Sequence, residues 1–215
     1  YRHRFQWHPD RVLKQPVLLD NGDVLPFDEG GLDWLKKGGR EYPYGYFCGS
    51  LYGYVRDIIG AASTMFAEDY ELFVEIIDTI AELAYQNLKF TLEQGATFDF
   101  GHFWEDICFK NGPLIIPSLF EELVGPHYRR ITALLNAHGV EIVSLDCDVC
   151  IDALVPTWFG NGVNTMFPIE VGKWDASIRP WRDQFGEGLR GVGGMNKVVF
   201  TRDRAAVDAE VERLR

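Results

Sequence analysis

The sequence predicts an α/β fold with parallel strands, the C-terminal part of a (β/α)8 TIM-type barrel. Short apolar runs alternate with helix-like runs, a rhythm typical of the β–α units that build a parallel sheet. In the C-terminal half, the strand-like runs are followed by segments that contain Glu105-Asp106, Asp146-Cys147-Asp148, Glu170 and Lys197. The C-terminal ends of barrel strands open onto the one face that carries the chemistry. The pattern therefore predicts an enzyme pocket.

The N-terminal residues 1–44 are expected to form a loop-rich segment ahead of the barrel-like part, residues 45–215. The pairs Gly30-Gly31 and Gly38-Gly39 are typical turn punctuation. The first barrel strand is predicted at residues 45–50, a short and mainly apolar run.

The clearest helix spans residues 69–94. Its apolar residues recur every three to four positions, as on one buried helix face, and Gly95 ends it. A strand is predicted next, at residues 97–101. A second long helix, residues 118–138, is expected to begin at a Ser118 cap and to bend at Gly125-Pro126.

Strands and shorter helices then alternate to the end of the chain. The predicted strands are residues 140–145, 162–167 and 189–192, and the predicted helices are residues 152–159, 175–185 with a break at Pro180, and 204–214. The chain is expected to be a fragment, because it begins at Tyr1 rather than Met and ends inside a helix. An eight-stranded barrel typically needs about 250 residues, so the 215 residues are expected to supply part of one.

Composition limits the partners. The net charge of −11 argues against a nucleic-acid surface, since affinity for phosphate comes from clustered Lys and Arg. The apolar runs are far shorter than the roughly 20 residues of a membrane span, and no signal peptide is visible. Four scattered cysteines are too few for a disulfide framework, so a cytoplasmic location is expected. A small-molecule substrate is the expected partner, with a homo-oligomer left open.

Cys147 and Cys150 have the CxxC spacing of redox and zinc sites, but their neighbours are acidic. Acidic neighbours raise the pKa of a thiol and lower its reactivity. Buried structural thiols are therefore favoured, with redox or zinc chemistry as the alternative.

Four carboxylates are the candidate catalytic groups: Asp106, Asp146, Asp148 and Glu170. Glu105 and Asp106 are adjacent and point in opposite directions on an extended segment, so Asp106 is favoured to enter the pocket and Glu105 is a substrate-binding candidate. Asp146 and Asp148 share a strand face, where two like charges raise a pKa or bind a divalent metal. Glu170 suits a base or a hydrogen-bond acceptor. The alternatives are helix caps, salt bridges and loop anchors.

The remaining candidates are predicted to bind substrate. His102 lies near the expected pocket mouth, and the planar fork of Arg179 can pair with a substrate carboxylate. Gly193 and Gly194 allow a ligand close to the backbone, from where Lys197 can reach an anion. The alternatives are a surface ion pair for Arg179 and a tight turn for the glycines.

Several stretches resemble the uroporphyrinogen decarboxylase superfamily. They are residues 103–117 (FWEDICFKNGPLIIP), 125–130 (GPHYRR), 161–170 (NGVNTMFPIE) and 191–197 (GVGGMNK). The resemblance spans roughly residues 45–215. It implies a (β/α)8 barrel with a deep pocket for a tetrapyrrole, or for a methyl donor presented by a corrinoid protein. The chain looks most like the corrinoid-linked methyltransferase branch, which is related to O-demethylation.

Two departures from the superfamily pattern matter. Its zinc-dependent methyltransferases carry His-x-Cys where this chain has Asp146 and Asp148, so the oxygen pair suits a harder divalent cation or no metal. The arginines and the aspartate on which the decarboxylases of the superfamily rely are not recognisable in residues 1–44.

Three functions follow. The favoured one is methyl transfer from a small methylated donor to a corrinoid (cobalamin) carried by a partner protein, with a carboxylate among Asp106, Asp146 and Asp148 as general acid. The second is uroporphyrinogen III decarboxylation in porphyrin biosynthesis, a lyase reaction that acidic strand ends oppose because its substrate is polyanionic. The third is a non-catalytic barrel that binds a tetrapyrrole or a corrinoid.

Overall fold

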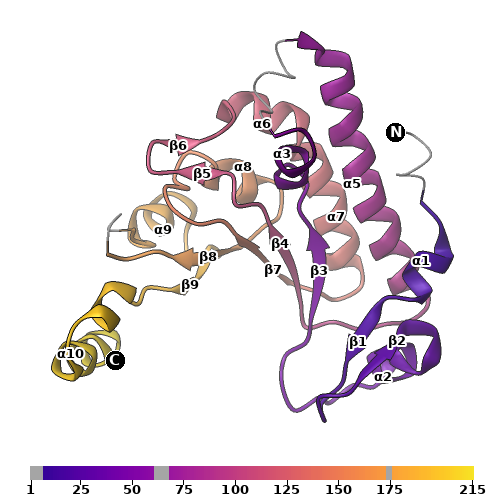
Figure 1. Ribbon diagram of the computed structural model, residues 1–215, viewed down its shortest axis with the longest axis horizontal. Coiled ribbons are helices and arrows are strands. Elements are labelled where there is room, and N and C mark those ends of the chain that lie inside the picture. Colours follow the sequence, from indigo (N-terminus) through magenta and orange to yellow (C-terminus); the bar gives the residue numbers. More distant parts are fainter. Residues whose placement is uncertain (1–6, 61–67, 173–175) are drawn as a thin grey trace.

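The computed structural model describes residues 7–60, 68–172 and 176–215. At its centre is a five-stranded sheet, in which all neighbouring strands are parallel and follow one another in chain order (Figure 1). The strands are β3 (Gly45–Gly49), β4 (Phe100–Trp104), β7 (Ile142–Asp146), β8 (Thr165–Ile169) and β9 (Arg190–Gly193). The predicted α/β class with a parallel sheet is confirmed, while a closed barrel is not formed by the described residues.

Helices connect the strands, as parallel pairing requires. In chain order they are α3 (Gly53–Ile59), α5 (Tyr70–Glu93), α6 (Pro117–Leu123), α7 (Gly125–Ala137), α8 (Val155–Gly160) and α9 (Arg179–Phe185), followed after β9 by the 3-10 helix η3 (Lys197–Thr201) and by α10 (Arg204–Leu214). Between β4 and α6 lies a small antiparallel pair, β5 (Cys108–Phe109) with β6 (Gly112–Pro113). Figure 1 shows α5 and α7 side by side along β3 and β4, with α10 standing apart near the C-terminus.

Residues 7–44 hold more regular structure than the loop-rich segment expected, while residues 1–6 lie outside the described part. The elements are α1 (Pro9–Leu13), the hairpin strands β1 (Pro16–Leu18) and β2 (Val24–Pro26), the 3-10 helix η2 (Phe27–Glu29) and α2 (Gly31–Lys36). Val17, Phe27 and Leu35 are buried in the same core as the sheet. The segment therefore packs against the sheet through its own apolar side chains.

The long helix at residues 69–94 is confirmed as α5, and the Asp69 carboxylate caps it by accepting the Leu72 N–H at 3.0 Å. The strand expected at residues 97–101 begins later, at Phe100, because two preceding N–H groups are engaged elsewhere. The Thr97 N–H donates to the Leu35 carbonyl, and the Asp99 N–H donates to the Tyr44 carbonyl.

Two helices, α6 and α9, begin differently from the expectation. Pro117 stands in the first turn of α6, where its missing N–H costs nothing, so Ser118 is not the cap. Pro180 likewise stands in the first turn of α9 instead of breaking a longer helix. Residue 175, where that helix was expected to begin, lies outside the described residues.

The two faces of the sheet have different surroundings. On β4, Phe103 faces the helices, and its ring centroid lies 4.9 Å from that of Tyr128 on α7. His102 and Trp104 alternate to the opposite side, here named the open face. The strand register places on this face Phe47, His102, Trp104, Ile142, Ser144, Asp146, Phe167 and Val192. Phe47, Ile142 and Val192 are 54%, 41% and 47% exposed, so this face is not fully covered.

A buried carboxylate joins the end of β4 to α3 and α7. Glu105, the residue after β4, is 0% exposed. Its oxygens accept hydrogen bonds from the N–H groups of Leu51 (2.8 Å), Tyr52 (2.9 Å) and Gly53 (2.7 Å), and from the hydroxyls of Ser50 (3.1 Å) and Tyr128. N–H groups at a helix start have no partner within the helix, so Glu105 acts as the cap of α3. Burial raises the pKa of Glu105, against the opposing effect of these hydrogen bonds.

Among the described residues, no helix combines the length and the apolar character needed to cross a membrane.

Replacing Glu105 with alanine is expected to lower the free energy of unfolding by at least about 3 kcal/mol, since each buried donor left unpaired costs about 1–3 kcal/mol. Glu122→Ala, at an exposed position of α6, is the control and should change stability by less than about 0.5 kcal/mol. Urea unfolding measures both. Equal midpoints for the two variants would show that the Glu105 network adds nothing to stability.

A second prediction concerns the contact between β4 and α7. A Cβ on Gly101 would lie 2.6 Å from Leu135 Cδ1, so Gly101→Ala is expected to cost about 1–3 kcal/mol through overpacking. Gly160→Ala is the matched control, because a Cβ there meets nothing within 4 Å. Thermal unfolding should separate the two variants. A G101A protein as stable as G160A would contradict the packing described here.

Candidate functional site

Carboxylates from three strand ends gather at the C-terminal edge of the sheet. Asp106 follows β4, Asp146 ends β7 with Asp148 two residues later, and Glu170 follows β8. These four residues are named the carboxylate cluster. Asp106 and Asp148 act electrostatically on Asp146, and Glu170 acts on Asp148. The structure therefore brings together the four acids that the sequence singles out as catalytic candidates.

Asp146 has the properties of a proton donor. It is half-buried at the end of the open face, and its carboxyl oxygens have no hydrogen-bond or ion-pair partner within the described ranges. Burial, together with the negative charges of Asp148 and Asp106, raises its pKa to about 6. A carboxyl group of this kind is still partly protonated near neutral pH and can give its proton to a reacting group.

Asp148 is more exposed and lies between opposing charges. Burial and the nearby Glu170 raise its pKa, while Lys197 acts in the opposite direction and Asp106 adds a smaller increase. Its side chain, like that of Asp146, bonds to none of the residues that the structure describes. Within the described part of the chain, the cluster acids without side-chain partners are thus Asp146 and Asp148. They were expected to share a strand face, but β7 ends at Asp146 and Asp148 lies beyond it.

Glu170 uses both of its oxygens within the chain. One accepts the N–H of Val149 at 2.9 Å, and the other lies 2.6 Å from Nζ of Lys197. Val149 itself has a φ of 78°, an unusual conformation for a β-branched residue. Glu170 therefore fixes the loop after β7 and the start of η3. The anion that Lys197 reaches is this carboxylate, and the ion pair raises the pKa of Lys197.

Asp106 is held by an arginine that the sequence did not single out. Its φ of 46° lies in the left-handed region, and its side-chain oxygen is 3.6 Å from Nη1 of Arg56. The same Arg56 nitrogen donates to the Asp106 carbonyl. Burial lowers the pKa of Arg56, but Asp57 and Asp106 outweigh it and the net effect is an increase. Arg56 lies on α3, a seven-residue helix whose sequence carries no clear period.

Glu105, predicted to bind substrate, has a structural role in this fold, because both of its oxygens are buried against the chain's own donors. Glu105 and Asp106 have opposite environments, as expected for adjacent residues. Glu105 enters the core, while Asp106 keeps a side chain that is 41% exposed.

His102 lies deeper on the open face, two residues before Trp104 and therefore about 7 Å from the strand end. Its Nδ1 is 2.8 Å from Oγ of Ser144, a residue that sequence reasoning missed because an isolated strand serine carries no pattern. Its ring meets Phe167 edge to face, at 6.0 Å between centroids. Burial lowers the pKa of His102, which favours the neutral ring.

The other predicted substrate contacts stay predictions, with structural roles visible for the glycines. A Cβ on Gly193 would lie 2.7 Å from the Ile169 nitrogen, and the Gly194 N–H donates to the Ile169 carbonyl at 2.8 Å. These glycines therefore let β9 turn closely against β8. Arg179 is exposed in the first turn of α9 and forms no ion pair with a described residue.

The donors that the structure describes do not complete a metal site. Among residues 7–60, 68–172 and 176–215, no group of three or more His, Cys, Asp or Glu side chains is placed to hold a metal ion. Catalytic zinc sites use three protein ligands, so the pair Asp146 and Asp148 does not fit zinc, and a harder cation there stays a prediction. Cys147 is buried, and burial with Asp152 raises the pKa of Cys150, which agrees with unreactive thiols.

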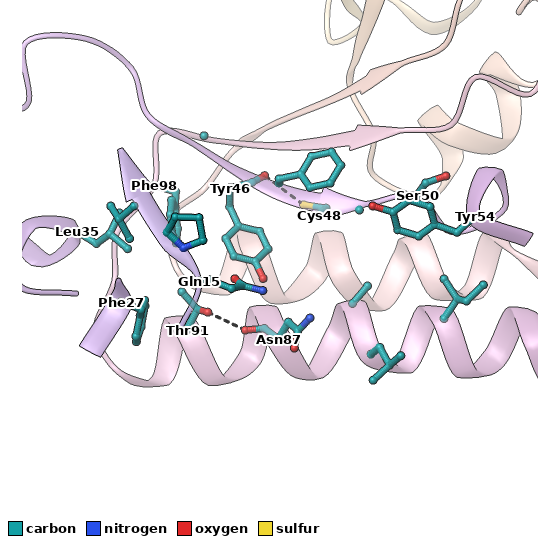
Figure 2. Close-up of a pocket in the computed structure, with 18 of the residues that line it drawn as sticks. Gln15, Phe27, Leu35, Tyr46, Cys48, Ser50, Tyr54, Asn87, Thr91 and Phe98 are labelled. Carbon is teal, nitrogen blue, oxygen red and sulfur yellow. Dashed lines mark hydrogen bonds between the residues drawn. The ribbon is translucent and has the colours of Figure 1, made fainter. Parts of the chain in front are cut away.

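A cavity of about 750 Å³ lies elsewhere, between β3 and α5 (Figure 2), and its lining includes none of the four carboxylates. The charged groups suited to proton transfer and this cavity are therefore separate features of the molecule.

No protein-family model and no curated protein sequence matches the chain. Among solved structures, the fold is similar to that of a methyltransferase from Methanosarcina mazei, with a TM-score of 0.56 and 15% sequence identity. The match covers 75% of this chain and 47% of the methyltransferase chain, so the sequence spans about half of that protein's length. At this identity the likeness shows the fold alone.

The raised pKa of Asp146 predicts how stability changes with pH. Because its pKa of about 6 in the folded chain exceeds the value of about 4 for an unperturbed Asp, its ionisation destabilises the fold as the pH rises through this window. Asp146→Asn removes that charge. The variant should therefore melt at a higher temperature than the wild type at pH 8 and at nearly the same temperature at about pH 3, which lies below both pKa values. An equal difference at both pH values would contradict the raised pKa.

Proposed function

We propose that this protein is a methyltransferase in which Asp146 is the general acid, while a methyl group passes from a small methylated donor to a corrinoid carried by another protein. The observation that carries the proposal is the Asp146 carboxyl group, half-buried, without a partner among the described residues, and with a pKa raised to about 6. Its place at the C-terminal edge of a parallel sheet, and the likeness of the fold to a methyltransferase, support the same reading.

Breaking a methyl–oxygen or methyl–nitrogen bond leaves the bonding electrons on the heteroatom. A proton delivered to that heteroatom during the step makes the fragment that carries it a better leaving group. Asp146 is suited to deliver it, because burial, with the charges of Asp148 and Asp106, keeps the proton on its carboxyl group. The corrinoid is the second substrate and supplies the acceptor for the methyl group.

The open face supplies a wall for the donor beside this acid. Trp104 and Phe167 lie next to Asp146 on the flanking strands, in register with it. Aromatic side chains around a few polar groups are typical of small-molecule sites. His102 lies deeper on the same face and offers a neutral ring nitrogen as a hydrogen-bonding group.

Decarboxylation of uroporphyrinogen is not favoured by the same geometry. A polyanionic substrate would meet four carboxylates at this edge. Of the cations that the structure describes, Arg56 and Lys197 contact the cluster, and they are already paired with Asp106 and Glu170.

The proposal is tested by comparing two methyl donors, with a reduced cobalamin as acceptor. With a donor whose leaving group is a poor one, such as an alkyl or methoxyaryl ether, Asp146→Asn should lower kcat about 10²–10⁴-fold. With a nitrophenyl methyl ether, whose leaving group needs no proton, the loss should be much smaller. Wild-type activity on the first donor should decline as the pH rises above about 6, because Asp146 then loses its proton.

Glu122→Gln, exposed on α6 and outside the cluster, is the control and should keep wild-type activity on both donors. An equal loss for the two donors would rule out acid catalysis by Asp146. A wild-type chain that binds the corrinoid protein but transfers no methyl group would be a non-catalytic binding barrel.

A further inference from the structure

Ser144 and Gly101 determine which nitrogen of the His102 ring carries its proton. Oγ of Ser144 lies 3.2 Å from the Gly101 carbonyl oxygen and 2.8 Å from Nδ1 of His102. A hydroxyl has one proton to donate, and a carbonyl oxygen can only accept. With a neutral ring, both contacts are hydrogen bonds only when Ser144 donates to the carbonyl and accepts the N–H of Nδ1. His102 therefore carries its proton on Nδ1, and Nε2 is left with a lone pair.

The Nε2 atom of His102 is available to a ligand. It has no hydrogen-bond partner among the described residues, and it does not belong to the buried polar side-chain atoms that lack one. The lone pair of Nε2 therefore keeps access to solvent on the open face. Burial lowers the pKa of His102, so the ring stays neutral near pH 7, and Nε2 accepts hydrogen bonds instead of donating them.

This acceptor and the Asp146 carboxyl group lie at two levels of the same face. His102 is in register with Ser144, and Asp146 follows two residues further along β7. Two residues of a parallel strand span about 7 Å. Trp104 and Phe167 flank Asp146 in register, and the Phe167 ring also meets His102 edge to face. A molecule with its methylated atom at Asp146 can therefore extend along this face, beside the Phe167 ring, to Nε2.

We propose that His102 selects methyl donors that carry a second group able to donate a hydrogen bond, an O–H or an N–H, about 7 Å from the methylated atom. His102 is thus a specificity residue of the proposed methyl transfer, on which this assignment rests. Ser144 is the positioning residue, because it fixes the ring in the form whose Nε2 only accepts. Ketones, ethers and carboxylates are disfavoured at this end of the site, because they leave the Nε2 lone pair without a proton to accept.

Two ligands with the same heavy-atom skeleton test this selection. They are para-methoxyacetophenone, whose ketone only accepts, and the alcohol formed by its reduction, which donates. NMR titration of the full 215-residue chain without a corrinoid gives both dissociation constants. The wild type should bind the alcohol at least about fivefold more tightly than the ketone, since the ketone forgoes the hydrogen bond to Nε2. His102→Asn should remove this preference, because its amide can replace Nδ1 but is too short to replace Nε2.

Substitutions of Ser144 test its positioning role. In Ser144→Ala the N–H of Nδ1 loses its acceptor, so the proton can move to Nε2, and the preference for the alcohol should fall to within about twofold. Ser144→Thr is the matched control, because it retains a hydroxyl and should retain the preference. The nitrogen chemical shifts of the His102 ring report the position of the proton in each protein. The proton should be on Nδ1 in the wild type and S144T, and at least partly on Nε2 in S144A.

Equal affinity of the wild type for alcohol and ketone would overturn the proposal, as would no binding of the alcohol at millimolar concentration. A wild-type ring protonated on Nε2, or on both nitrogens, near pH 7 would also overturn it, and this measurement needs no variant to fold. Because the titrations require no methyl transfer, the two proposals fail separately. A wild type that prefers the alcohol but transfers no methyl group would support the selection by His102 and overturn the proposed function alone.

Discussion

The buried carboxylate of Glu105 is the interaction on which the C-terminal edge of the sheet depends. The groups that donate hydrogen bonds to Glu105 lie at and just before the start of α3 and on α7. One side chain therefore fixes both of these helices to the end of β4. α3 in turn carries Arg56, which holds both the carbonyl and the side chain of Asp106. An acid inside the core thus positions the neighbouring acid that faces solvent.

The carboxylate cluster divides into two kinds of acid. Asp106 and Glu170 are paired with Arg56 and Lys197, and they fix loops. Asp146 and Asp148 have no such partner among the described residues. A paired acid still carries its negative charge and so raises the pKa of an unpaired neighbour. Structural ion pairs and a proton donor can therefore share one edge of the sheet, with each acid's partners deciding its role.

Local signals predicted the parts of the fold that depend on neighbours in sequence. α5 has a regular apolar period and an Asp69 cap, and it was placed within one residue at each end. The acids at strand ends were also identified, because the position of a residue just after an apolar run needs no knowledge of distant contacts. Whether each acid binds substrate or a metal stays a prediction.

The parts that sequence reasoning missed depend on distant contacts. α3 has seven residues and lacks a side-chain cap of its own, because the capping group is Glu105, 52 residues away from Gly53. Neither Arg56 nor the structural role of Glu105 is visible without that contact. The later start of β4 has the same cause, since the Thr97 and Asp99 N–H groups are bonded to residues of the N-terminal segment.

The loop after β7 places stability and function in competition at one residue. Val149 is held at a φ of 78° while its N–H binds Glu170. A β-branched residue in this conformation stores about 1–3 kcal/mol of strain, which glycine would relieve at the expense of a looser loop. Selection for stability alone would therefore favour glycine here. Selection for a rigid carboxylate edge would keep the strained side chain, so the residue found at this position in related proteins would record which pressure each has experienced.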